Sequence, residues 1–234
     1  MDLIGRSAPM VALRAEIARL APLDTPVLIT GERGTGKDLV ASLIHKAGPR
    51  AGRRLLTFEV DGITESQLDV ELRQAHGSTV LFCQVQRWPR EWQPTLQHLL
   101  RQPALVRRDA TQQAPVDVRV IVTADADPDE LLAEGTVSEA LDEAPGVDTI
   151  HVPPLRDRRE DVPLLARYFL DRSARQYRKD ITGLVPEALS ILTRHAWPGN
   201  VRELTSTIER AVVFSTTKRI TPDDVAHLLQ ETSP

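Results

Sequence analysis

Apolar residues before position 153 form two kinds of run along the chain. Some runs are short and continuous, as in strands that are buried on both faces of a parallel sheet. Others place apolar residues three or four positions apart, as on one face of a helix. The continuous runs predict strands at 27–30, 55–60, 79–82 and 116–122, and the spaced runs predict helices at 11–20, 39–44, 67–72 and 96–100.

After Pro153-Pro154 the apolar residues keep helical spacing only. Asn200 is expected to cap the helix that follows it, with Glu203 completing a capping box. Strands alternating with helices predict an α/β domain with a right-handed parallel sheet. We therefore expect an α/β domain over residues 1–154 and a small all-helical lid domain over residues 155–234.

Composition limits the class of protein further. The net charge of −4 gives no basic face for nucleic acid, and one cysteine excludes an internal disulfide framework. The histidines form no cluster with that cysteine at ligand spacing, so we expect no metal site. No signal peptide and no run long enough to span a bilayer is present. We expect a cytoplasmic protein without a membrane partner.

A glycine-rich segment joins the run at 27–30 to the helix that follows it. Strand, glycine-rich turn, lysine and helix are the context of a phosphate-binding loop, in which backbone N–H groups and the helix N-terminus face the phosphate. In the usual motif a Ser or Thr follows the lysine and binds magnesium, whereas this chain has an aspartate there. The predicted nucleotide-binding residues are Gly31, Glu32, Arg33, Gly34, Thr35, Gly36, Lys37 and Asp38.

Several stretches together resemble the central AAA+ ATPase domain of bacterial enhancer-binding proteins, the NtrC-like activators of sigma-54 RNA polymerase. That family has the fold of a P-loop NTPase, a parallel sheet flanked by helices and followed by a helical lid. The resemblance also adds Ile4 and Gly5, beside the adenine, and Arg202, on the phosphates, to the predicted nucleotide site. The stretches that carry the resemblance are 3–7, 27–38, 44–45, 118–121, 153–162 and 197–204.

The chain departs from this family where the family hydrolyses ATP. The third predicted strand ends in Cys83-Gln84, where the resemblance implies an Asp for magnesium and a Glu that activates water. A neutral thiol is a poor magnesium ligand, and a glutamine cannot take a proton from water. A redox role for Cys83 is disfavoured, because no cation lies near it in the sequence.

Asp125 stands where the resemblance implies a sensor asparagine. An ionised Asp only accepts hydrogen bonds, and two like charges about 4 Å apart repel by roughly 4 kcal/mol at an effective dielectric of 20. A terminal phosphate is therefore repelled unless magnesium or Lys37 intervenes. In the alternative, Asp125 holds magnesium in place of the missing Asp. A magnesium site of the usual kind is not expected.

Two further family features are missing. Ser138 and Ala144 occupy the positions of the arginine fingers, which the resemblance implies act on the neighbouring subunit's nucleotide. Only residues 73–76 stand where the family inserts the loop that grips sigma-54. We expect no productive contact with sigma-54. We also expect no direct DNA binding, because no helix-turn-helix pattern follows residues 225–229. No receiver domain is expected before residue 1, so any regulation is expected to pass through a protein partner or a small ligand.

The sequence therefore predicts a pseudo-ATPase that binds ATP or ADP without hydrolysis and regulates through a protein partner, either itself or a related AAA+ activator. In one alternative the nucleotide site is vestigial and the chain is an interaction module or a sensor of a small ligand such as a cyclic dinucleotide, for which Arg50, Arg53 and Arg54 are candidates. In another it is an inhibitory subunit of a mixed AAA+ ring, and the arginines and the base for any hydrolysis come from an intact subunit.

Overall fold

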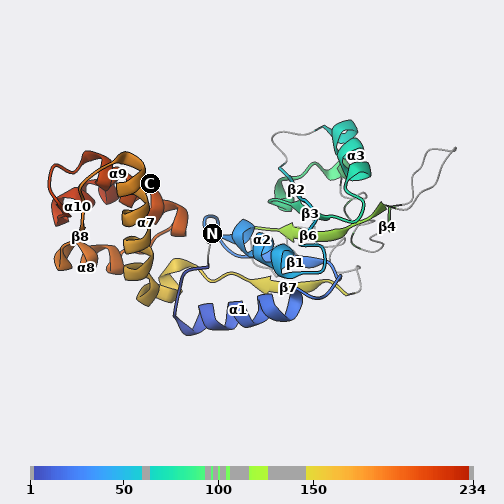
Figure 1. The fold of residues 1–234 in the computed structure, drawn as a ribbon, viewed down its shortest axis with the longest axis horizontal. Coiled ribbons are helices and arrows are strands. Elements are labelled where there is room, and N and C mark those ends of the chain that lie inside the picture. The colour runs from blue at the N-terminus through green and yellow to red at the C-terminus, as the bar shows by residue number, and fades with distance from the viewer. Residues whose placement is uncertain are drawn as a thin grey trace. The chain divides into compact units, whose positions relative to one another are not determined.

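The structure is a computed structural model, which describes residues 3–59, 64–92, 96, 100, 104–105, 116–125 and 146–231. Its contacts divide the chain into two compact units. The sheet unit comprises Leu13–Glu32 and Lys37–Val152, and the helical unit comprises Met1–Ala12, Arg33–Gly36 and Pro153–Pro234 (Figure 1). The helical unit thus includes an N-terminal segment and part of the glycine loop, so the domain boundary at 154/155 stays a prediction.

The sheet unit is built on five parallel strands in the order β2-β3-β6-β1-β7. Each of the three central strands is buried along its whole length, as expected for a parallel sheet covered on both faces. The fold class predicted from the sequence, α/β with a parallel sheet, is confirmed. The strands are β1 (Val27–Thr30), β2 (Leu55–Phe58), β3 (Thr79–Phe82), β6 (Arg119–Thr123) and β7 (Asp148–His151).

The sequence placed most of these elements within a few residues. It missed β7, whose burial alternates and whose apolar run is short. It also merged β6 with the separate short strand at 116–117, which pairs antiparallel with the strand at 104–105. Leu96 and Leu100 of the helix expected at 96–100 are buried, but most of that segment lies outside the described residues. The other α-helices and strands described in this unit are α1 (Ala8–Leu20), α2 (Lys37–Ala47), α3 (Glu65–Gln74), β4 (Ala104–Leu105) and β5 (Val116–Asp117), with α1 beginning in the helical unit. Two short 3-10 helices, Val85–Arg87 and Arg90–Trp92, follow β3.

Arg119 links the sheet to the end of α1. It is 1% exposed, and its guanidinium donates to the main-chain oxygens of Leu20 and Ala21 at 2.7 and 2.8 Å. Carbonyls at the end of a helix have no intrahelical N–H to accept from, so they need a partner from elsewhere. Burial lowers the pKa of Arg119. The arginine therefore satisfies the end of α1 from within β6.

The helical unit packs α-helices 7 to 10 around one core (Figure 1). That core includes Trp197, which is fully buried. The Trp197 indole N–H donates to the Leu192 oxygen at 2.8 Å, so its polar atom is satisfied inside the core. A two-residue pair of strands, β8 and β9, joins the helices where the sequence predicted helices only. The elements are a 3-10 segment (Leu155–Asp161), α7 (Val162–Tyr177), β8 (Gly183–Leu184), α8 (Pro186–Arg194), α9 (Asn200–Phe214), β9 (Arg219–Ile220) and α10 (Pro222–Glu231).

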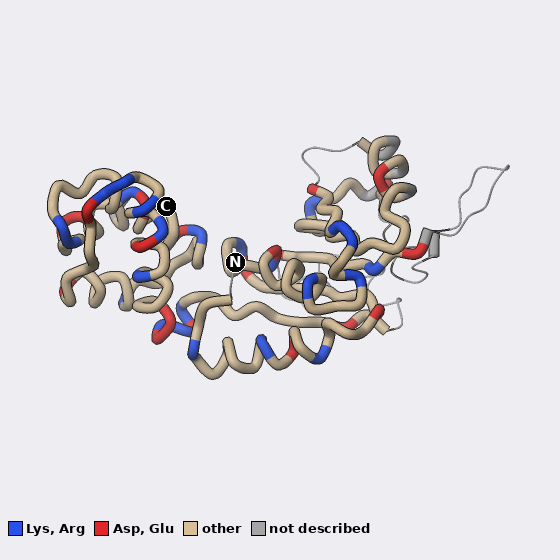
Figure 2. The backbone as a smooth tube through the Cα atoms, viewed as in Figure 1, with Lys and Arg blue, Asp and Glu red and all other residues tan. Residues whose placement is uncertain are grey.

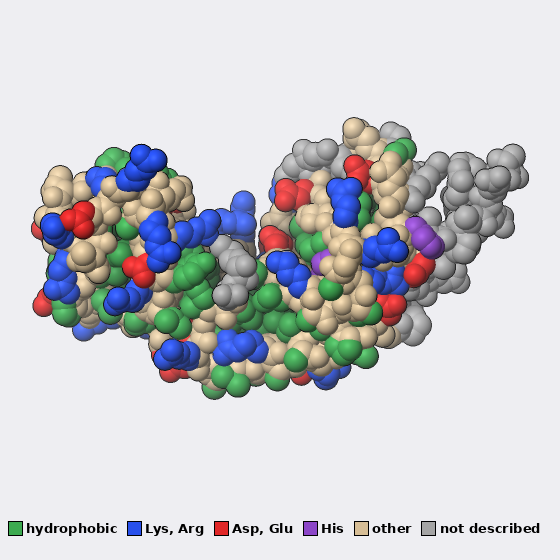
Figure 3. Space-filling view, viewed as in Figure 1, with side chains coloured by type: hydrophobic (Ala, Val, Ile, Leu, Met, Phe, Trp, Pro, Cys, Tyr) green, Lys and Arg blue, Asp and Glu red, His purple; other side chains and the backbone are tan. Residues whose placement is uncertain are grey.

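Basic and acidic residues are interspersed along both units (Figure 2). The face of the sheet unit drawn in Figure 3 likewise mixes both signs of charge. On that face no basic stripe of the kind that binds nucleic acid is visible among the described residues. Within the part of the chain that the structure describes, no helix has the length and apolar character to cross a bilayer.

Candidate functional site: a glycine loop with an internally paired lysine

The glycine loop follows β1 and has the backbone that its glycines predict. Gly31, Gly34 and Gly36 have φ angles of 137°, 82° and 107°, a region that residues with a side chain rarely adopt. Gly34 is further constrained, because a Cβ atom there would lie 2.3 Å from the Gly199 oxygen. Glycine is therefore required at Gly34 both by its backbone angles and by its close approach to the start of α9.

Three consecutive carbonyls of the loop accept hydrogen bonds from within the helical unit. Asn200 Nδ2 donates to the Arg33 oxygen at 3.1 Å, and the Arg202 main-chain N–H donates to the Gly34 oxygen at 3.2 Å. Arg158, which is 3% exposed, donates to the Thr35 oxygen at 3.2 Å. The sequence did not predict this arrangement. It fixes the loop's carbonyls to the segments around 158 and 200.

The predicted capping role of Asn200 is wrong. Gly199 is the cap of α9, and no side chain caps it, while Asn200 is the first helical residue with φ 52°. Its fully buried amide is used elsewhere, since Oδ1 accepts from the Leu155 N–H at 2.7 Å and Nδ2 binds Arg33. Glu203 does reach back, accepting from the Gly199 N–H at 2.7 Å. Only the glutamate half of the expected box is present.

Asp161 holds the N-terminal segment that contains Ile4 and Gly5. Its carboxylate, 1% exposed, accepts from the main-chain N–H groups of Arg6 and Ser7 at 2.5 and 3.0 Å and from the Ser7 hydroxyl at 2.6 Å. Ile4 packs against the core of the helical unit, and a Cβ on Gly5 would lie 2.8 Å from Asp161 Oδ2. The structure thus fixes this predicted adenine-side segment in the helical unit through one buried carboxylate.

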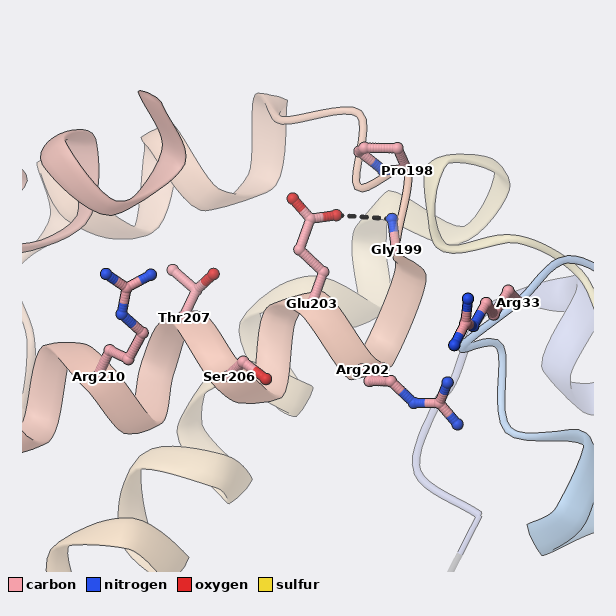
Figure 4. Close-up of a pocket in the computed structure, with 8 residues that line it drawn as sticks. All are labelled: Arg33, Pro198, Gly199, Arg202, Glu203, Ser206, Thr207 and Arg210. Carbon is pink, nitrogen blue, oxygen red and sulfur yellow. Dashed lines mark hydrogen bonds between the residues drawn. The ribbon is translucent and has the colours of Figure 1, made fainter. Parts of the chain in front are cut away.

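Arg202 lines a cavity of about 340 Å³ in the helical unit (Figure 4). Arg33 and Arg202 lie at one end of this cavity in the close-up, and Arg210 lies at the other. Oε1 of Glu203, also in the lining, is buried and has no hydrogen-bond partner among the described residues. The predicted contact of Arg202 with phosphates stays a prediction, and its surroundings are strongly basic.

Lys37 begins α2 and is 6% exposed. Its ammonium donates to the main-chain oxygens of Gly31 and Glu32 at 2.7 and 3.0 Å, and it forms an ion pair with Asp125 Oδ1 at 2.7 Å. An ammonium has three donors. These three contacts therefore account for the whole hydrogen-bonding capacity of Lys37.

Asp125 lies just beyond β6, at the same edge of the sheet as the residues that follow β1 and β3. Its second oxygen, Oδ2, accepts from Gln84 Nε2 at 2.6 Å, and its own N–H donates to Gln86 Oε1 at 3.3 Å. Gln84 itself adopts φ 52° and accepts from Arg87 at 3.1 Å. Asp125 thus joins Gln84 to Lys37, with one carboxylate oxygen on each.

Cys83 and Asp38 also lie together, with the thiol 3.9 Å from Asp38 Oδ1. Burial raises the pKa of Cys83 to about 12, and the carboxylates of Asp38 and Glu59 contribute to the rise. A protonated thiol is a poor ligand for magnesium, and both oxygens of Asp125 already have partners. These donors do not fit a magnesium site of the usual kind. The described residues contain no group of three or more metal-binding side chains.

Cys83 is expected to resist alkylation in the folded chain. At pH 8 a pKa of about 12 leaves about one part in ten thousand as thiolate, against about one quarter for an ordinary cysteine. The rate with iodoacetamide should therefore be about a thousandfold lower than in urea-unfolded chain, measured by mass spectrometry. Cys83→Ser is the control, since the chain has one cysteine. Labelling at equal rates in both states would contradict a buried thiol.

Ser138 and Ala144, at the predicted arginine-finger positions, lie outside the described residues. The short connection predicted at 73–76 does lie within them. Residues 75–78 form a turn between α3 and β3, in which the Ser78 N–H donates to the Ala75 oxygen at 2.8 Å and Gly77 has φ 74°. A direct turn leaves no inserted segment between these two elements.

Comparison with known proteins decides the family. Residues 4–155 match the sigma-54 interaction domain, and residues 156–234 match the AAA+ ATPase lid domain. The chain belongs to the sigma-54 interaction domain family. The resemblance drawn from the sequence motifs is confirmed, and so is the combination of an AAA+ sheet with a helical lid.

Relatives of this sigma-54 interaction domain include transcription regulators. The transcriptional regulatory protein ZraR of Klebsiella oxytoca is 37% identical over 233 residues, covering 92% of this chain and 53% of ZraR. The regulatory protein AtoC of Escherichia coli is 33% identical over 242 residues, covering 95% of this chain and 52% of AtoC. The chain thus spans about half the length of the curated relatives it matches.

Solved structures agree with this family. NtrX from Brucella abortus in complex with ADP matches with a TM-score of 0.85 and 32% identity, covering 99% of this chain and 56% of NtrX. The same protein in complex with ATP also matches with a TM-score of 0.85. The Thermotoga maritima RuvB branch migration motor, at 14% identity and a TM-score of 0.65, shares the fold alone.

Proposed function

We propose that this chain is a nucleotide-binding regulatory module that binds ATP or ADP and does not hydrolyse ATP. The observation that carries the proposal is the glycine loop, whose left-handed glycines and buried Lys37 fit a phosphate. The ADP and ATP complexes of NtrX, a relative with 32% identity, support binding. The basic lining around Arg33 and Arg202 supports the predicted role of Arg202.

The proposed lack of hydrolysis rests on the end of β3. Cys83 is a buried, protonated thiol where magnesium would need a carboxylate, and Gln84 has no basic group to take a proton from water. The resemblance adds the loss of both arginine fingers, at Ser138 and Ala144, each worth about 10³–10⁵ in turnover. On these grounds the proposed site binds a nucleotide without the groups that cleave it.

We further propose that the module regulates through a protein partner, either another copy of itself or a related AAA+ activator. The direct turn at residues 75–78 supports this, because it leaves no inserted segment between α3 and β3, and the resemblance implies that the family's sigma-54-gripping loop is inserted between β2 and β3. In a mixed ring such a subunit would bind nucleotide, contribute no catalytic groups, and lower the turnover of its neighbours.

Calorimetric titration with ATP and ADP, each with and without magnesium, tests the binding. We expect saturable binding, and a stabilisation of about 2.7 kcal/mol at a ligand concentration of about one hundred times Kd. Lys37→Ala should abolish both. Lys46→Ala, on the exposed side of the same helix, is the matched control and should change neither. No affinity for either nucleotide at millimolar concentration would rule out the proposal.

Phosphate release tests the absence of hydrolysis. We expect no steady release from the purified chain, with or without magnesium. A mixture with an intact relative should hydrolyse ATP more slowly than the relative alone if mixed rings form. Steady release by the isolated chain that is suppressed in Lys37→Ala would overturn the non-hydrolysing part of the proposal while leaving nucleotide binding intact.

A second candidate function is favoured by the internal contacts of the loop. Lys37 is fully paired, and three loop carbonyls bind Asn200, Arg202 and Arg158. Under this second candidate the glycine loop is kept because its internal contacts stabilise the fold. The chain is then an interaction module or a small-ligand-sensing module. Under this candidate Lys37→Ala lowers stability without ligand and leaves partner binding unchanged.

A further inference from the structure

The lysine of the glycine loop already holds an anion that the protein supplies. Lys37 Nζ lies 2.7 Å from Asp125 Oδ1, and its other two donors point to the Gly31 and Glu32 oxygens. The Lys37 side chain is 6% exposed and that of Asp125 is 22% exposed, so water screens this pair less than a surface pair. A phosphate that approaches Lys37 meets a donor already in use.

The carboxylate is also held from its other side. Gln84 Nε2 donates to Asp125 Oδ2 at 2.6 Å, and the Asp125 N–H donates to Gln86 Oε1 at 3.3 Å. The Gln84 N–H donates to Thr123 Oγ1 at 3.1 Å, and the Gln84 side-chain oxygen accepts from Arg87 at 3.1 Å. Asp125 is therefore positioned by a connected set of hydrogen bonds that extends over the ends of β3 and β6.

From this geometry we propose that Asp125 is an internal competitor of polyphosphate ligands for Lys37, positioned for that role by Gln84. A ligand phosphate has to displace the carboxylate from the ammonium, and the displaced carboxylate then repels the ligand's negative charge. Binding is weakened on both counts, and more so for ligands of higher charge. Asp125 thereby acts as a specificity-determining residue of the proposed nucleotide site, on whose existence this inference rests.

Asp125→Asn tests the competition. The amide keeps the size of the side chain and removes its charge, so Lys37 is released for a ligand. We expect ATP to bind at least about tenfold more tightly than to the wild-type chain, ADP to gain less, and adenosine to gain nothing. Affinities are measured by calorimetry, and variants are compared only after thermal melts show that they are folded.

Asp148→Asn is the matched control. Asp148 has a similar exposure of 24% and also pairs with a cation, Arg19, but it begins β7 and so lies at the opposite edge of the sheet from Asp125. It should leave all three affinities unchanged. Gln84→Met removes the hydrogen bond that positions the carboxylate, together with the Arg87 contact, and leaves the charge of Asp125 in place. It should give a smaller gain with the same order of ligands. If Asp125→Asn does not fold, Gln84→Met still tests the competition.

The outcomes separate this inference from the proposed function. Tight binding of ATP by Asp125→Asn with none by the wild-type chain supports the competition and contradicts nucleotide binding by the natural protein. If the wild-type chain binds ATP and Asp125→Asn changes that affinity by less than about twofold, nucleotide binding is supported and the competition is contradicted. An equal gain for adenosine indicates a loosened fold and overturns the inference, and no binding by either chain overturns both.

Discussion

Replacing Asp161 by alanine is expected to lower the free energy of unfolding of the helical unit by about 3–5 kcal/mol. The change leaves the N–H groups of Arg6 and Ser7 and the Ser7 hydroxyl without the acceptor they share. It also removes the negative charge that favours the buried guanidinium of Arg158, whose pKa burial lowers. The measurement is urea unfolding, with hydrogen exchange at the Arg6 and Ser7 amides as the local probe.

Asp157→Ala is the control for Asp161→Ala, because Asp157 is in the same 3-10 segment and its side chain is exposed. It should cost less than about 0.5 kcal/mol, as surface substitutions usually do. Asp161→Asn keeps one acceptor oxygen and should fall between the two. If Asp161→Ala and Asp157→Ala unfold at the same urea concentration, the carboxylate does not anchor the N-terminal segment.

Gly34→Ala is expected to cost about 2–5 kcal/mol and to displace the loop from the start of α9. Two separate effects add up here. The φ of 82° is strained for alanine, and the new Cβ would lie 2.3 Å from the Gly199 oxygen, a main-chain atom that cannot rotate away. The Arg202 N–H to Gly34 oxygen bond should then break, and nucleotide affinity should fall with it. Thermal melts and calorimetric titration measure the two losses.

Gly36→Ala separates the two effects, since Gly36 has φ 107° but nothing within 4 Å of an added Cβ. Strain alone should cost about 1–3 kcal/mol. The difference between the two variants then measures the close approach of Gly34 to Gly199. If Gly36→Ala is as destabilising as Gly34→Ala, contact with the start of α9 plays no part.

Much of the fold could be predicted from local patterns. The continuous run at 79–82 matched β3 residue for residue, and the run at 27–30 matched β1. Prediction was weaker where local signals compete. The polar positions of β7 gave no buried run, and Asn200 looked like a helix cap because asparagine before a helix is usually one. In the folded chain its amide serves Leu155 and Arg33 instead.

The amino-acid sequence by itself determined the family and most of the strands and helices, because the motifs and apolar runs that indicate them lie in adjacent residues. Only the tertiary structure decided which distant residues are partners. The partner of Lys37 is Asp125, and the partner of Asp161 is a segment 155 residues away. No periodicity encodes such pairs, since they form only when parallel strands bring their carboxyl ends to one edge and the N-terminal segment packs into the helical unit.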